Sequence, residues 1–359
     1  MVHDLSPFVW KISGEFGIRW YGLSYLFAFF CAFVLVSWLS QRQRNGLTSQ
    51  MILDFVIFSA IGTLIGGRLG YCIFYAPDLF LKFRPDFPFW GVLALNEGGM
   101  ASHGGIVGLV LALTLFSLKS GVGQLYLFDL AALCGSLGIF FGRLANFVNG
   151  ELVGRVVDSS YALAVKFPQD ILFWPQYDFK KLASLNTVIE KIPELQTVVT
   201  PEEWAKLSEA GSMTEASRIK ITVVLNQILT AIQGGNEGAK LAVAPLLDYR
   251  HPSQLYGAFG EGLFIFLCLF VIWYKPRRSG IIAAWFILLY SIVRLVDEQF
   301  RLPDPQLGFR WLELTQGQWL SIGTLIIGLW WMVIFIGRRE TIASPGWGLG
   351  PNVRIHRRH

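Results

Sequence analysis

Three long windows without an acidic or basic side chain limit what this chain can become. Residues 20–41, 98–118 and 314–337 contain no Asp, Glu, Lys or Arg. Each window is long enough to cross a bilayer as a helix, which takes about 20 apolar residues. Only 15% of the 359 residues are charged and 53% are hydrophobic. We therefore expect an integral membrane protein, and a soluble enzyme, a disordered protein and a coiled coil are excluded.

Four further apolar blocks are long enough to span a membrane but contain or adjoin charged residues. They lie at about 51–75, 126–149, 253–274 and 280–300. Together with the three charge-free windows they predict an all-α polytopic membrane protein with seven transmembrane helices.

Three connections between these blocks are basic and contain no acidic residue: 42–50, 119–125 and 275–279. Because they alternate along the chain, they lie on one side of the membrane, and the positive-inside rule makes that side cytoplasmic. The N-terminus is then outside and the C-terminus inside. The net charge of +5 is thus explained by topology, and we expect no nucleic-acid partner.

The long connection between the fourth and fifth spans predicts an inserted, mostly helical extracytoplasmic subdomain. It contains a capping box at Thr200–Glu203 with Pro201 at the first helical position. A helical stretch follows at about 217–233 and stops at Gly234. The predicted segments are spans one to four (1–155), the inserted subdomain (156–250), spans five to seven (251–340) and a basic cytoplasmic tail (341–359).

The four cysteines all lie inside apolar blocks, where single cysteines are usually packing residues. They are Cys31, Cys72, Cys134 and Cys268. We therefore predict no disulfide, no metal site and no cofactor.

The sequence contains none of three common catalytic motifs: His-Glu-x-x-His, the P-loop and Gly-x-Ser-x-Gly. If a reaction occurs, the nucleophile is expected to belong to the substrate, while the protein supplies a base and stabilises an anion.

Charged residues within the spans gather at one level of the membrane. The predicted topology puts Arg68, His103, Arg143, Arg294 and Glu298 in its outer half. Such charges are costly in a bilayer and are functional candidates. One arginine alone is equally well explained by an ion pair that joins two helices. As a set, the arginines outnumber the nearby acids, which indicates a bound anion, and a lipid phosphate is the obvious anion at that depth.

Helical spacing and glycines refine this picture. Arg143, Asn146 and Gly150 share a helix face, and Arg294 and Glu298 are four residues apart and can pair. Glycine pairs stand beside Arg68 and His103, at 66–67, 98–99 and 104–105. They predict either close helix packing or contact between the backbone and a ligand.

A family resemblance is carried by the run 142–155, Gly-Arg-Leu-Ala-Asn-Phe-Val-Asn-Gly-Glu-Leu-Val-Gly-Arg. It closely resembles the signature of bacterial prolipoprotein diacylglyceryl transferases. Four further segments resemble the same family in the same order: 20–22, 103–105, 251–256 and 290–304. The resemblance covers most of the chain except the long connection.

The resemblance implies a multi-pass enzyme of the bacterial cytoplasmic (inner) membrane. Such an enzyme moves the diacylglyceryl group of phosphatidylglycerol to the lipobox cysteine of a prolipoprotein signal peptide, so that a thioether forms and glycerol phosphate leaves. This is the first step of lipoprotein maturation. By resemblance, the catalytic residues are Arg143 and Arg294, which hold the phosphate, and His103, which accepts the thiol proton or orients the base. The implied substrate-binding residues are Tyr21, Asn146, Glu151, Gly154, Tyr290 and Glu298, the last of which orients Arg294.

The sequence departs from the family pattern at several positions, and two other functions are alternatives to the transferase. Arg19 replaces a frequent His, and Gly257 replaces a usual Glu. An anion or lipid transporter is the first alternative, although the chain shows no internal repeat and its polar level lies off-centre. A catalytically inactive relative that acts as a binding module is the second. Structural alternatives also exist for Arg68, as an ion-pair partner, and for His251, as a helix cap.

Overall fold

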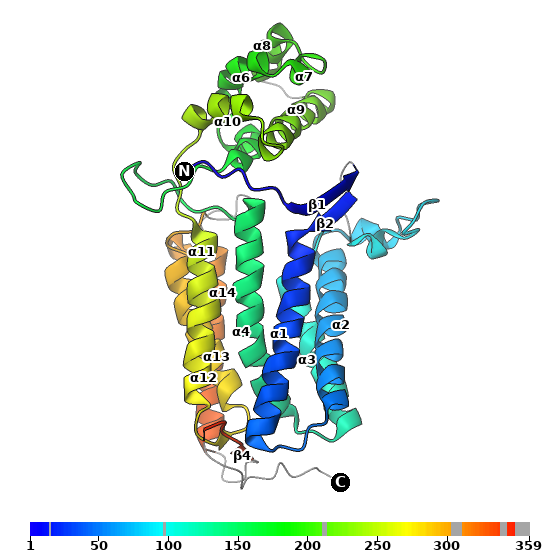
Figure 1. The fold of residues 1–359 in the computed structure, drawn as a ribbon, viewed down its shortest axis with the longest axis vertical. Coiled ribbons are helices and arrows are strands. Elements are labelled where there is room, and N and C mark those ends of the chain that lie inside the picture. Colours follow the sequence, from blue (N-terminus) through cyan, green and yellow to red (C-terminus); the bar gives the residue numbers. More distant parts are fainter. Residues whose placement is uncertain (14–15, 96–97, 210–213, 303–310, 338–342, 349–359) are drawn as a thin grey trace. The chain divides into compact units, whose positions relative to one another are not determined.

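The computed structural model describes residues 1–13, 16–95, 98–209, 214–302, 311–337 and 343–348. These residues form two compact units. Unit 1 contains Met1–Ser24, Phe141–Gly260 and Arg294–Trp319. Unit 2 contains Tyr25–Phe140, Glu261–Val293 and the C-terminal part from Leu320. The described chain is mostly helical (Figure 1).

Long apolar helices dominate the fold. Within the described ranges, six helices are long and apolar enough to cross a membrane: Trp20–Gln43 (α1), Ser49–Phe74 (α2), Ser102–Ser120 (α3), Gln124–Asn149 (α4), Ser253–Ile272 and Gln316–Ile334. The fifth consists of α11 (Ser253–Gly257), a π-helical segment (Ala258–Phe264) and α12 (Ile265–Ile272), and the last belongs to α14 (Gln316–Gly337). The prediction of a mostly helical chain with several helices long and apolar enough to cross a membrane is confirmed.

The block predicted at 280–300 forms α13 (Ile281–Asp297), a helix of 17 residues that is shorter than the other six. The N-terminal end of α13 is capped by a side chain of another helix of unit 2. The buried carboxylate of Asp129 on α4 accepts hydrogen bonds from the backbone N–H groups of Gly280 (2.8 Å) and Ala283 (2.9 Å). Asp129 thus caps α13 as a local N-cap side chain would.

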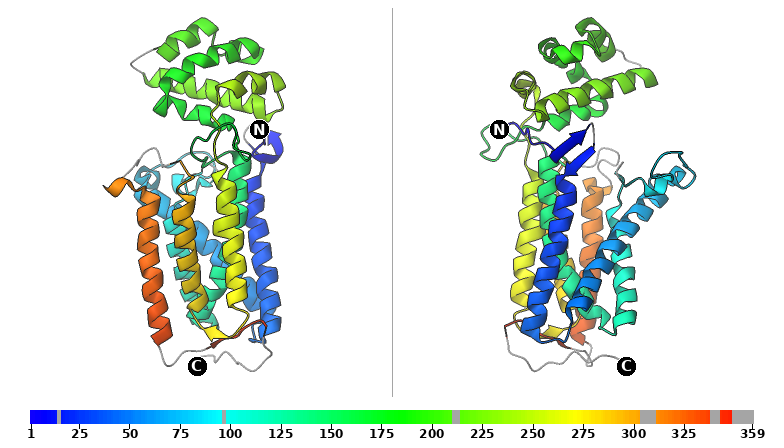
Figure 2. Two further views of the ribbon diagram at one scale, coloured as in Figure 1. Left: turned by 90° about the vertical axis from the view of Figure 1, so that its left-hand side faces the viewer. Right: turned by 45° about the vertical axis from the view of Figure 1, so that its right-hand side comes forward.

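In unit 2, α2 and α3 lie side by side (Figure 2) because both present glycines to each other. A Cβ atom at Gly66 would lie 2.7 Å from the Cα of Gly108, and one at Gly104 would lie 2.9 Å from the Cα of Gly70. Backbones this close leave no room for a side chain. Of the two roles predicted for the glycines near His103, close helix packing is the one the structure gives to Gly66 and Gly104.

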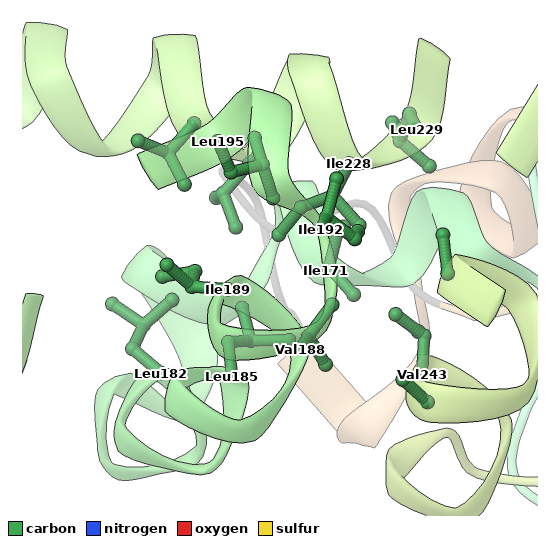
Figure 3. Close-up of a cluster of buried hydrophobic side chains, with 14 of the residues drawn as sticks. Ile171, Leu182, Leu185, Val188, Ile189, Ile192, Leu195, Ile228, Leu229 and Val243 are labelled. Carbon is green, nitrogen blue, oxygen red and sulfur yellow. The ribbon is translucent and has the colours of Figure 1, made fainter. Parts of the chain in front are cut away.

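The inserted segment of unit 1 folds around its own hydrophobic core (Figure 3). Its elements are Pro168–Leu172 (η4), Trp174–Tyr177 (α5), Phe179–Leu185 (η5), Asn186–Lys191 (α6), Pro193–Gln196 (α7), Pro201–Glu209 (α8), Glu215–Gln233 (α9), Glu237–Val243 (α10) and Ala244–Leu246 (η6). The helices α6, α8, α9 and α10 gather into one cluster (Figure 1). The core includes Leu182, Leu185, Val188, Ile189, Trp204, Val224 and Ile228, each no more than 1% exposed.

The local helix signals in this segment are confirmed. The hydroxyl of Thr200 accepts the backbone N–H of Glu203 at 3.2 Å at the start of α8. Helix α9 begins at Glu215, two residues before the predicted start, because Thr214 caps it by accepting the N–H of Ser217. It ends before Gly234, as predicted.

Two short antiparallel strand pairs were missed by the all-α prediction. One is a hairpin of β1 (Phe8–Ser13) and β2 (Phe16–Arg19) that leads directly into α1. The other pairs β3 (Arg277–Arg278) with β4 (Ala343–Ser344). Strands of two to six residues give too few alternating positions for a period-2 pattern to stand out from apolar sequence.

The N-terminus of unit 1 is anchored by a buried histidine. The ring of His3 is 0% exposed and lies 5.3 Å from the rings of both Phe147 and Phe167. Its backbone N–H donates to the carbonyl of Lys166 at 2.8 Å. Burial lowers the pKa of His3 below its usual value of 6.5, and the nearby Asp4 opposes this only in part.

We expect His3 to make unit 1 less stable in acid. Between the lowered pKa and 6.5 the unfolded chain binds a proton that the folded chain does not, so stability is present above pH 6.5 and falls as the pH drops below it. Each unit of pKa difference is worth about 1.4 kcal/mol. Thermal unfolding in detergent from pH 5 to 7.5 should show a smaller acid loss for His3→Gln than for the natural chain. An equal loss in both would contradict this origin.

Candidate functional site

Three predicted residues meet where α4 ends. The side-chain amide of Asn146 donates a hydrogen bond to the Tyr21 hydroxyl, which in turn donates to Glu151 Oε2 at 3.2 Å. Helix α4 stops at Asn149, and Gly150 turns the chain with a φ of +67°. Gly150 therefore lies beyond the helix rather than on the face of Arg143 and Asn146, which corrects that part of the prediction. The turn brings the exposed carboxylate of Glu151 back to Tyr21.

The residues that follow form the hydrogen-bonded centre of unit 1. Gln254 donates to the carbonyl of Glu151 at 2.5 Å, and Ser253 donates to that of Leu152 at 2.9 Å. On the other side, the N–H of Leu302 donates to the carbonyl of Val153 at 3.3 Å. The signature segment is thus held between the start of α11 and the chain that follows α13.

Gly154 has both of its backbone groups occupied. Its N–H donates to the carbonyl of His251 at 3.1 Å, and its carbonyl accepts from Arg250 Nη1 at 3.2 Å. Arg250 is itself held by Asp170 at 2.9 and 3.1 Å in a buried ion pair. A Cβ atom at position 154 would lie 2.8 Å from the carbonyl oxygen of Phe300. Only glycine fits there without moving the backbone.

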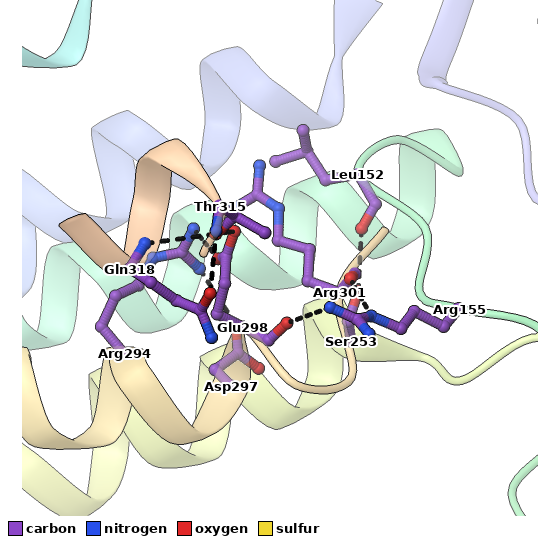
Figure 4. Close-up of polar contacts among 9 residues, drawn as sticks. All are labelled: Leu152, Arg155, Ser253, Arg294, Asp297, Glu298, Arg301, Thr315 and Gln318. Carbon is purple, nitrogen blue, oxygen red and sulfur yellow. Dashed lines mark hydrogen bonds and ion pairs between the residues drawn. The ribbon is translucent and has the colours of Figure 1, made fainter. Parts of the chain in front are cut away.

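Arg294 sits between two buried acids on the last turn of α13 (Figure 4). Its Nη1 lies 3.1 Å from Asp297 Oδ2 and its Nη2 lies 2.6 Å from Glu298 Oε2. The pairing with Glu298, four residues on, is confirmed, whereas the contribution of Asp297 was not predicted. The backbone of the same turn is held by Arg155, which donates to the carbonyls of Arg301 (2.9 Å) and Glu298 (3.3 Å).

Arg143 lies on α4, one turn before Asn146, and its side chain is half-buried. It runs past Gly257 of α11, where an added Cβ would be 3.1 Å from Arg143 Nε. The absence of a side chain at position 257 therefore leaves the space that this arginine occupies.

The other two predicted residues belong to unit 2. His103 is the second residue of α3 and its side chain is exposed. Tyr290 is half-buried on α13 and stacks on Phe286, with ring centroids 5.7 Å apart.

Arg68 has a structural role, which the sequence offered as the alternative to phosphate binding. Its partners, however, are backbone carbonyls and not an acidic side chain. Its guanidinium donates to the backbone oxygens of Val92 (2.8 Å), Gly91 (2.8 Å), Gly99 (3.0 Å) and Gly98. The side chain is 5% exposed. Four carbonyls stabilise this cation in place of an anion. Arg68 is therefore not a candidate for binding the phosphate.

His251 does not cap the helix that follows it, which corrects the predicted alternative. The residue before α11 is Pro252, and no side chain caps that helix. The His251 ring instead lies 3.2 Å from the hydroxyl of Tyr256 and packs against Tyr161 and Phe300. Burial lowers its pKa from 6.5.

Asp170, Asp297 and Thr315 were missed from the sequence as supporting residues, and Arg250, Ser253 and Gln254 were noted only as polar residues at the start of the fifth span, without a role. Arg250 carried a weak signal as a charge at the start of a span, but Asp170 lies 80 residues away and had none. Among the residues that the structure describes, no cluster of His, Cys, Asp and Glu could hold a metal ion. The site offers guanidinium groups for an anion and an exposed carboxylate anchored by Tyr21.

Comparison with known proteins agrees with these motifs. The sequence model of the prolipoprotein diacylglyceryl transferase family matches residues 7–334. A Bdellovibrio bacteriovorus protein named phosphatidylglycerol–prolipoprotein diacylglyceryl transferase is 54% identical over 358 residues, covering 100% of both chains. Proteins of the same name from Psychrobacter arcticus and Acinetobacter baumannii are 34% and 32% identical, covering 92% and 89% of this chain and 93% and 89% of their own. The chain belongs to the prolipoprotein diacylglyceryl transferase family.

Proposed function

We propose that this chain transfers the diacylglyceryl group of phosphatidylglycerol to the lipobox cysteine of a prolipoprotein. The observation that carries the proposal is the 54% identity, over the full length of both chains, to a relative named for this transfer. The site geometry supports it, because the signature segment 151–155 is bonded to the same turn that holds Arg294 and Glu298. No cofactor enters the proposed reaction.

In the proposed step the cysteine sulfur attacks the methylene carbon that carries the phosphate oxygen. A sulfur–carbon bond forms, and the carbon–oxygen bond breaks with its electron pair remaining on the phosphate. Glycerol phosphate leaves, and the thiol proton passes to a base, for which the resemblance makes His103 the candidate. A base or a cationic setting is needed because a free thiol has a pKa of about 8.5.

Arg143 and Arg294 are proposed to bind the phosphate and to stabilise the charge that it gains as a diester becomes a monoester. A guanidinium donates two parallel hydrogen bonds to phosphate oxygens, and its effect is largest in a dry, preorganised site. Glu298 orients Arg294 through the 2.6 Å ion pair. Tyr21, Asn146, Glu151 and Tyr290 are proposed to bind or line the substrate. Gly154, whose backbone groups are both occupied, is proposed to act on substrate binding by holding the segment that carries Glu151.

The proposed setting is the cytoplasmic membrane of a bacterium, crossed seven times with α13 as the sixth span. The acid-free basic connections support an N-terminus outside and a C-terminus inside. The inserted helices of 156–250 would then be extracytoplasmic, between the segments 1–155 and 251–340, and 341–359 would be a cytoplasmic tail.

A mass-shift assay tests the proposal. Purified protein is incubated with phosphatidylglycerol and a lipobox peptide, and a Cys→Ser peptide serves as the control. We expect a diacylglyceryl addition on the cysteine peptide alone, with an equal amount of glycerol phosphate released. No addition, under conditions where the Bdellovibrio relative modifies the same peptide, would refute the proposal. Movement of labelled lipid between vesicles without an adduct would instead favour a lipid transporter.

A further inference from the structure

The start of α14 is built by a reciprocal pair of hydrogen bonds. The Thr315 hydroxyl accepts the backbone N–H of Gln318 at 3.2 Å, and the Gln318 side chain accepts the N–H of Thr315 at 2.8 Å. Both residues are buried, at 2% and 6% exposure. This is the capping-box arrangement, which satisfies backbone donors that a helix start leaves open.

The same hydroxyl makes a further contact that capping does not require. It donates its proton to Glu298 Oε1 at 2.8 Å (Figure 4). A hydroxyl has a single proton, so that proton is committed to the carboxylate. Position 317 takes part as well, because a Cβ at Gly317 would lie 2.7 Å from the same oxygen. The absent side chain lets the carboxylate rest against the positive end of the helix.

The two oxygens of Glu298 therefore have separate partners. Oε1 accepts from Thr315, while Oε2 forms the 2.6 Å ion pair with Arg294 Nη2. Glu298 is 4% exposed, so no bulk water can replace the Thr315 proton. Without that donor the carboxylate can rotate about its last bond, so the Nη2 end of the Arg294 guanidinium would lose its fixed partner while Nη1 stays on Asp297.

We propose that Thr315 is a positioning residue that fixes the direction of the Arg294 guanidinium through Glu298. Gly317 makes the space for this contact, and Gln318 holds Thr315 in place. The inference rests on the proposed function, in which Arg294 stabilises the phosphate as it leaves. Thr315 touches neither substrate nor reacting atoms, so its effect on turnover passes through Arg294.

The test is steady-state kinetics of the peptide transfer by Thr315→Val and Thr315→Ser. Loss of a hydrogen bond to a buried charge should lower kcat about 10-fold in Thr315→Val, with the KM for the peptide unchanged. Thr315→Ser keeps the hydroxyl and should restore kcat. In a Glu298→Gln background the valine change should cause less than a twofold further loss, since coupled residues are not additive.

Matched controls separate positioning from helix capping. Thr214 caps α9 by accepting the N–H of Ser217 at 3.2 Å, as Thr315 does for Gln318, but it is exposed, and its hydroxyl contacts the Ser217 hydroxyl at 2.9 Å instead of a buried carboxylate. Thr214→Val should leave kcat within twofold of the natural chain. Unchanged kcat in Thr315→Val, an equal loss in Thr214→Val, or independent losses in the Glu298 double variant would overturn the inference.

Failure of the proposed function gives a different result. In that case the natural chain forms no adduct, and binding of phosphatidylglycerol to the detergent-solubilised protein replaces turnover as the measurement. The inference then requires that Thr315→Val weakens this binding in the natural chain but not in Glu298→Gln. An equal weakening in both backgrounds would overturn it.

Discussion

Arg143→Ala is expected to lower kcat/KM for the transfer by about 1,000-fold while the protein still folds. Removing one donor from a preorganised anion site typically costs about 100- to 1,000-fold in rate, and this side chain would contribute a full charge as well as its hydrogen bonds. The folded state should tolerate the change because Arg143 is only half-buried and lies against Gly257 rather than inside a hydrophobic core.

The measurement is adduct formation by mass spectrometry, with thermal unfolding in detergent measured on the same samples. Arg218→Ala, which removes an exposed arginine from α9, controls for the loss of one positive charge. It should retain full activity. Arg143→Ala with more than a tenth of the natural activity would exclude the proposed phosphate role.

Arg294 needs a different substitution. Alanine would leave Asp297 and Glu298, 6% and 4% exposed, without the cation that lies between them. An uncompensated buried charge costs about 3–5 kcal/mol, so activity could be lost simply through unfolding. Arg294→Lys keeps the charge but loses the planar fork, and it therefore tests phosphate geometry in a chain that still folds.

Spans and caps were predictable because their signals are local. Three charge-free windows and three of the four further apolar blocks correspond to the six helices of membrane length. Thr200 marked the start of α8, and the predicted ends of α9 lie within two residues of the observed ones. The cap of α13 was not predictable, because Asp129 reaches Gly280 across 151 residues of sequence. The residues around Asp129 in the sequence do not indicate which helix its carboxylate will cap.

The same limit applies to the site. The Arg294–Glu298 pair follows from helical spacing, whereas the contacts of Tyr21 with Asn146 and Glu151 join residues 125 and 130 positions apart. Counting arginines against acids also failed at Arg68, since backbone carbonyls stabilise it. Sequence shows charged groups but not carbonyls that face inward, so an excess of cations overstates the need for an anion.

Gly154→Ala is expected to abolish measurable transfer and to lower the melting temperature. The added methyl group would meet the carbonyl oxygens of His251 and Phe300, the second at 2.8 Å, and both belong to backbone that cannot rotate away. Overpacking of this kind costs about 1–3 kcal/mol. The larger effect is on activity. The backbone must move, and a shift of about 1 Å in a catalytic group can cost about 100-fold in rate.

A glycine-to-alanine change at a position with free space serves as the control for this steric effect. Gly138 lies inside α4, and among the described residues no heavy atom outside the local helix backbone lies within 4 Å of an added Cβ. Gly138→Ala should keep its activity, and its stability should not fall, because alanine favours helix by about 1 kcal/mol over glycine. Full transfer by Gly154→Ala would mean that the segment between His251 and Phe300 can open without cost. The hydrogen-bonded centre of unit 1 would then not be what fixes the geometry of the site.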